Sequence, residues 1–142
     1  MASFRVSGLD DLIESTSHMS RIPDGVKSNI LTAIGEVIRK AQAALADRIL
    51  SGPYSTGETA RAVALSKPKL GSSENKISVT FKGSRQRGGA KKATRNAVIA
   101  FINEFGKRGQ PARPFVKRAN DQAGDEAVEA GAKAFYAWLE KQ

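Results

Sequence analysis

The most informative stretch of this sequence reads NAVIAFINEFG (96–106), KRGQPARPF (107–115) and VKRAND (116–121). Residues 97–105 are rich in β-branched and aromatic side chains and have the length of one strand, so we expect a strand there. Gly106 and Gly109 predict a turn after it. Pro111 and Pro114 exclude regular helix at their own positions, but Pro114 suits the start of a following helix. We therefore expect a rigid hinge between a strand and a C-terminal helix.

Two long helices are expected on either side of this region. Apolar residues recur at spacings of three and four over residues 26–50, which predicts one helix with a continuous apolar stripe. A second helix is expected over residues 115–142, with alanines on one broad side that allow close approach to a sheet or a neighbouring subunit. Gly124 and Gly131 weaken that helix, so a bend or break is expected there.

Shorter elements complete the expected fold. Residues 59–65 open with a helical turn and extend into a strand that ends before Pro68, and residues 77–81 alternate apolar and hydroxyl side chains as a half-buried strand does. These two strands are expected to form a hairpin through residues 71–75. A strand at 4–6 and a short helix from Gly8 precede them.

The expected fold class is therefore α+β, with a single domain over residues 1–142. A small, mainly antiparallel sheet of three to four strands is packed by a long N-terminal helix and a C-terminal helix. So few elements leave one face of the sheet poorly covered, which favours oligomerisation.

Positive charge is concentrated in the middle of the chain. The formal net charge is +9, whereas residues 76–118 carry twelve basic side chains and one acid, a balance of +11. Such a patch attracts polyanions and acidic protein surfaces in a salt-dependent way. Residues 82–95 are glycine-rich and almost without apolar side chains, so we expect a mobile loop there. The loop's cations, expected to face DNA or an acidic partner, are Lys82, Arg85, Arg87, Lys91, Lys92 and Arg95.

Nothing in the sequence favours catalysis, a metal or a cofactor. The absence of cysteine excludes disulfides, thiol nucleophiles and thiolate metal sites. The one histidine, His18, lies in a polar Ser/Thr segment with no cysteine and no spaced acidic cluster around it, and is expected to be an ordinary surface or interface residue. Asp10, Asp11 and Glu14 suit the first turn of a helix, where acids complement the dipole. The glycine-rich residues 83–89 lack the Gly-Lys-Ser/Thr ending of a phosphate loop.

A membrane partner is not expected either. No apolar run reaches the roughly 18 to 20 residues that span a bilayer, and the N-terminal residues lack the apolar core of a signal peptide. We therefore expect a protein that is made and kept in a cytoplasm.

A family resemblance rests on Glu104-Phe105-Gly106, followed by Gln110-Pro-Ala-Arg-Pro-Phe115 and a helix that contains Ala119. This pattern resembles the signature of small structural proteins of tailed phages and prophages, the tail-completion, neck or head–tail joining components. The resemblance extends in order to Gly8-Leu9-Asp10-Asp11-Leu12, the helix at 26–50 and Pro53-Tyr-Ser-Thr-Gly57. The chain departs from the family at Lys107, where members often carry Thr or Ser, so a contact that needs this hydroxyl is not expected.

The resemblance implies a virion protein that forms a homo-oligomeric, hexameric ring at the head–tail junction or the head-proximal end of the tail. It implies contacts with neighbouring connector and tail proteins, contact with DNA passing through the ring, and assembly in the host bacterial cytoplasm. The expected subunit or partner contacts are Glu104, Phe105, Gly106, Pro111, Arg113, Pro114 and Phe115.

Two alternatives stay open at this point. The residues themselves also allow a non-specific basic DNA-binding protein, whose affinity falls steeply with salt. At the hinge, Glu104 could pair with Arg113 within one chain and Phe115 could fill the core, which is as reasonable as a direct subunit contact.

Overall fold

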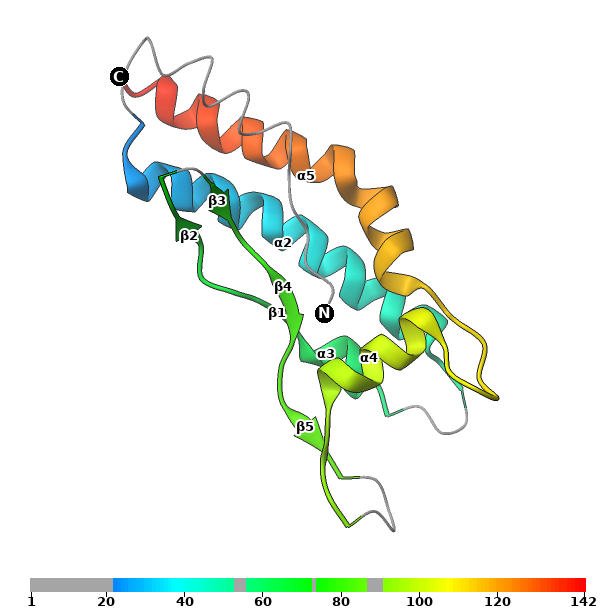
Figure 1. Ribbon diagram of the computed structural model, residues 1–142. Helices are drawn as coiled ribbons and strands as arrows, with labels where there is room; N and C mark the ends of the chain where they lie inside the picture. Colours follow the sequence, from blue (N-terminus) through cyan, green and yellow to red (C-terminus); the bar gives the residue numbers. More distant parts are fainter. Residues whose placement is uncertain (1–21, 53–55, 73, 87–90) are drawn as a thin grey trace.

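The computed structural model describes residues 22–52, 56–72, 74–86 and 91–142. Two long helices, α2 (Asp24–Ile49) and α5 (Phe115–Leu139), lie side by side and dominate the arrangement (Figure 1). Both helices were predicted, and the α+β class is confirmed. None of the described helices is long and apolar enough to cross a membrane. The strand expected at 4–6, the helix expected from Gly8, and His18 lie outside the described residues.

The two helices meet along matching rows of residues spaced by four. The buried row of α2 consists of Ile30, Ile34, Ile38, Gln42 and Ala46. The buried row of α5 consists of Ala119, Ala123, Ala127, Gly131 and Phe135. Rows spaced by four are the ridges that interdigitate when helices pack. The small side chains of α5 therefore face the N-terminal helix, and not a sheet or a neighbouring subunit.

Gly131 marks the closest approach of the two helices. A Cβ atom added there would lie 2.6 Å from Ile34 Cγ1, whereas a Cβ at Gly124 would meet nothing within 4 Å. The helix α5 runs through both glycines without interruption, so the expected break does not occur. Its packing against α2 compensates for the low helix propensity of glycine.

A long antiparallel hairpin packs against α2, which lies between the hairpin and α5 (Figure 1). After the short helix α3 (Glu58–Ala62), β1 (Val63–Leu65) pairs with β4 (Val79–Phe81), and β2 (Lys69–Leu70) pairs with β3 (Asn75–Lys76). The register shifts by one residue between the two pairs, near Pro68, which has no N–H to donate to a ladder. The predicted helical turn, strand pair and hairpin are confirmed.

The hairpin also packs closely against α2 at a glycine. A Cβ at Gly35 would lie 2.5 Å from Leu65 Cδ1 and 3.3 Å from Ile77 Cδ1. Ile34, the neighbour of Gly35, faces α5. The consecutive residues Ile34 and Gly35 therefore pack on different elements, Ile34 on α5 and Gly35 on the hairpin.

The predicted strand at residues 97–105 is wrong, because this segment is the helix α4 (Asn96–Phe105). Residues 97–102 are all apolar, and such a run does not separate helix from strand by periodicity. The burial pattern shows the difference: the neighbours Asn103 and Glu104 are both buried, whereas in a strand they would face opposite sides. Gly106 ends the helix at φ 77°, and its N–H donates to Ile102 O at 2.7 Å.

The basic loop expected over residues 82–95 is partly ordered as a ladder. The strand β5 (Ser84–Arg85) pairs with β6 (Thr94–Arg95), directly before α4. The prediction of a loop without regular structure is therefore wrong at both of its ends. Residues 87–90, with Arg87, lie outside the described residues.

The glycines of α5 provide a matched test of the helix packing. We expect Gly131→Ala to lower the free energy of unfolding by about 1 kcal/mol. The added methyl group would overpack the contact with Ile34, which costs about 1–3 kcal/mol, whereas alanine gains only about 1 kcal/mol over glycine in helix propensity. Gly124→Ala should raise it by about 1 kcal/mol, since no atom lies near the new methyl group. Urea denaturation measures both changes, and equal stabilisation by the two variants would contradict the close approach.

Candidate functional site

The end of α4 and the start of α5 are joined through Asn103, which is 8% exposed. Its Oδ1 accepts hydrogen bonds from Arg113 Nη2 at 2.8 Å and from Gln110 Nε2 at 3.2 Å. Its Nδ2 donates to Ile99 O at 3.0 Å, and its own carbonyl oxygen accepts from Arg113 N at 2.6 Å. One buried amide side chain therefore fixes the connecting segment 106–114 against α4.

Glu104 binds the first turn of α5. Its Oε2 accepts the N–H of Val116 at 2.8 Å and its Oε1 accepts the N–H of Lys117 at 3.0 Å. The N-cap residue Pro114 has no side-chain group for this purpose, so a carboxylate from another helix satisfies the free N–H groups. Its negative charge also lies at the positive end of the helix dipole. Glu104 is thus bonded to the backbone of α5 and forms no ion pair with Arg113.

Gly106 lets the chain turn back on itself. A Cβ there would lie 2.9 Å from both Gln110 O and Ala112 N, and φ is 77°. The backbones of Lys107 and Gln110 pair across the turn at 2.9 and 3.0 Å. Pro111 follows on the surface. The turn expected from the glycines is present in this hinge segment, but the hinge joins two helices, and its rigidity stays a prediction.

Phe115 is fully buried and packs edge to face on Phe81, with ring centroids 5.8 Å apart. The expectation that it fills the core is therefore confirmed. Within the described structure, the seven residues expected at an interface divide by exposure: Glu104 and Phe115 are buried, Gly106, Arg113 and Pro114 are half-buried, and Phe105 and Pro111 are exposed. The buried residues Glu104 and Phe115 hold the segment in place through contacts inside the chain. The role of the seven residues in subunit contacts stays a prediction.

An apolar stripe is exposed along α4, and we name it the α4 stripe. It consists of Val98, Phe101 and Phe105, which are 45%, 52% and 66% exposed. The rings of Phe101 and Phe105 lie 4.7 Å apart between centroids. Exposed apolar groups that gather in this way commonly mark an interaction site. Sequence reasoning missed Val98 and Phe101 because it assumed a strand, and only their exposure on α4 shows that they share a face with Phe105.

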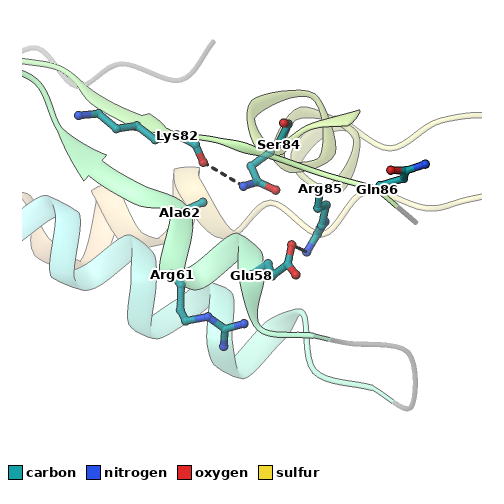
Figure 2. Close-up of a pocket in the computed structure, with 8 residues that line it drawn as sticks. Glu58, Arg61, Ala62, Lys82, Ser84, Arg85 and Gln86 are labelled. Atoms are coloured by element: carbon teal, nitrogen blue, oxygen red, sulfur yellow. Dashed lines mark hydrogen bonds and ion pairs between the residues drawn. The ribbon is translucent and has the colours of Figure 1, made fainter. Parts of the chain in front are cut away.

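Arg85 holds the base of the β5–β6 ladder to α3, beside an open hollow of about 500 Å³ (Figure 2). Its Nη1 donates to Thr56 Oγ1 at 3.0 Å, and its Nη2 donates to Thr59 Oγ1 at 3.0 Å. Glu58 Oε2 lies 3.6 Å from Nη1. Asn96 also lines the hollow, and its Nδ2 donates to the carbonyl oxygen of Lys82 at 2.9 Å.

The expected cations of the basic segment therefore play different parts. Arg85 is engaged within the chain, with a side chain only 15% exposed. Lys82, Lys91, Lys92 and Arg95 are exposed and can meet a polyanion. The structure does not describe Arg87.

Comparison of the chain with protein-family models, curated proteins and solved structures finds no match. The phage-family resemblance therefore rests on the sequence patterns alone. The surfaces described above, the α4 stripe and the exposed cations beside it, carry the functional argument.

Removing the Glu104 carboxylate tests whether it holds the start of α5. We expect Glu104→Ala to lower the free energy of unfolding by about 2 kcal/mol, because two backbone N–H groups lose their acceptor. Glu104→Gln should cost less, since one amide oxygen remains. The control is Asp47→Ala, an exposed acid on α2, which should change stability by less than about 0.5 kcal/mol. Equal urea midpoints for Glu104→Ala and the control would contradict the assignment.

Proposed function

We propose that this chain is a structural subunit of a tailed-phage virion, which assembles with copies of itself into a ring at the head–tail junction or the head-proximal end of the tail. The observation that carries the assembly is the exposed α4 stripe. Its three side chains point away from the core on a short helix whose opposite face is fixed to the rest of the chain.

The support beneath the stripe suits an assembly surface. Asn103 and Glu104 bind the connecting segment and the first turn of α5 from the buried side of α4. A surface that is already ordered loses little conformational entropy when it binds, so more of the contact energy appears as affinity.

The exposed cations fit the expected contact with DNA inside a ring. Lys82, Lys91, Lys92 and Arg95 lie on or beside the β5–β6 ladder, which leads directly into α4. Contacts from lysine and arginine to phosphate are independent of base sequence, as a passage for DNA requires.

The virion part of the proposal comes from the sequence resemblance. It includes hexameric order, contacts with the adjoining connector and tail proteins, and assembly in the host bacterial cytoplasm. The proposed activity is structural, without catalysis or a cofactor.

Native mass tests the assembly. We expect the purified chain to form a discrete oligomer that persists at high salt, because apolar contacts are not screened, and to appear as rings in negative-stain images. Phe101→Ser combined with Phe105→Ser should give monomers in light scattering, while the control Ala44→Ser, on the exposed side of α2, should not. Urea denaturation confirms that each variant is folded. A wild-type chain that stays monomeric at every concentration would contradict self-assembly.

A non-specific DNA-binding protein is the second candidate, favoured by the exposed cations. Lys91→Gln, Lys92→Gln and Arg95→Gln together should weaken duplex binding and reduce the slope of log affinity against log salt by up to about 0.9 for each lost phosphate contact. The control removes the same charge elsewhere, through Lys40→Gln, Lys133→Gln and Lys141→Gln, which are also exposed. Equal loss in both triple variants would show that the β5–β6 region is not the binding surface. Strong, salt-sensitive DNA binding by a monomer would favour this candidate over the ring.

A further inference from the structure

A second exposed apolar set lies on the outer side of α5. Val128, Tyr136 and Leu139 are 45%, 54% and 37% exposed. Asp121 and Asp125 precede them on the same face, at helical spacings of four and three residues, and are also exposed. We name these five residues the α5 stripe. Its first residues, Asp121 and Asp125, face away from the buried row that packs on α2, whereas Leu139 follows buried Phe135 by four residues and lies next to that row.

The two stripes differ in their charged surroundings. Residues 119–132 of α5 contain acids and no base, and these acids are Asp121, Asp125, Glu126 and Glu129. The α4 stripe is followed by Lys107 and Arg108 and preceded by Arg95, all exposed. The acid within α4, Glu104, is buried and bonded to α5. The α4 stripe thus has a basic border, and the acidic border of the α5 stripe is formed by Asp125, Glu126 and Glu129 around Val128. Asp121 is already paired with Lys117, whose Nζ lies 3.2 Å from Asp121 Oδ2.

The apolar residues of the two stripes also lie at different ends of the molecule. Figure 1 shows α4 beside the first turns of α5, far from the C-terminal half that carries Val128, Tyr136 and Leu139. At 1.5 Å per residue, Val128 is roughly 20 Å and Leu139 roughly 35 Å along the helix from its start. Within one chain the two stripes therefore cannot cover each other.

We propose that the α4 stripe of one copy docks on the α5 stripe of the next copy. Opposite charges then surround the apolar contact, whereas two α4 stripes meeting face to face would bring basic groups together at a cost. A contact between two different surfaces is heterologous, and repetition of it closes a ring or extends a filament. This inference rests on the proposed self-assembly and adds the pair of surfaces and the direction of the contact.

Mixing two blocked variants tests the pairing. Phe101→Ser with Phe105→Ser blocks the α4 stripe, and Val128→Ser with Tyr136→Ser blocks the α5 stripe. Each variant alone should be monomeric. Their equimolar mixture should give a dimer of one copy each and nothing larger, because one intact α4 stripe and one intact α5 stripe remain able to pair. Native mass spectrometry measures the composition.

A second set of variants changes only exposed charged residues and keeps the apolar residues, so a loss of assembly is not explained by misfolding. Asp125→Lys with Glu129→Lys should weaken assembly by about tenfold or more, corresponding to about 1.4 kcal/mol. Adding Lys107→Glu and Arg108→Glu to the same chain should restore it.

The outcomes separate the inference from the function on which it rests. A wild type that never assembles overturns both. A wild type that assembles while the α5-blocked variant assembles equally well overturns the pairing alone. Absence of the mixed dimer, from blocked variants that urea denaturation shows to be folded, does the same.

Discussion

The close approach of α5 to α2 is the contact on which the hairpin and α4 build, since the hairpin packs on α2 and α4 packs on α5. It is possible because alanine and glycine occupy every fourth position of α5 from Ala119 to Gly131, opposite isoleucines at the same period on α2. The pairing is antiparallel, since Gly131 meets Ile34 near one end while Gln42 Nε2 donates to Asn120 Oδ1 at 2.9 Å nearer the other. A buried amide of this kind loses its hydrogen bond if the helices slide, which favours one register.

The hinge segment 106–114 fixes α4 to the pair of helices α2 and α5. Once α5 is placed by α2, its first turn presents two free N–H groups, and Glu104 reaches them from α4. Asn103 fixes the segment between the helices. Both acceptors come from the buried side of α4, so the opposite side is left with Phe101 and Phe105 toward solvent. The exposure of the α4 stripe is thus a consequence of how the hinge satisfies its polar groups.

The parts of the fold that follow a regular period could be predicted from the sequence, whereas parts set by distant contacts could not. The helix at 26–50 has a long periodic stripe, and the strand at 77–81 alternates. Residues 96–105 lack either signal, and their β-branched and aromatic content pointed to a strand; buried Asn103 and Glu104 override that propensity by bonding to groups up to 13 residues away. Arg85 was expected to face a polyanion, but Thr56 and Thr59, far earlier in the sequence, bind its guanidinium.

Charge distribution bears on the proposed pairing of a strongly basic chain with its own copies. A net charge of +9 repels two copies at long range, yet this repulsion is screened beyond about 10 Å at moderate ionic strength. At contact, the local charges count most, and α5 offers the acidic surface that the α4 region lacks. The apolar groups at the centre of each stripe then supply attraction that salt does not weaken. Salt therefore reduces both the general repulsion and the local attraction while the apolar contact persists, so we expect the proposed assembly through these stripes to tolerate salt far better than binding to phosphate does.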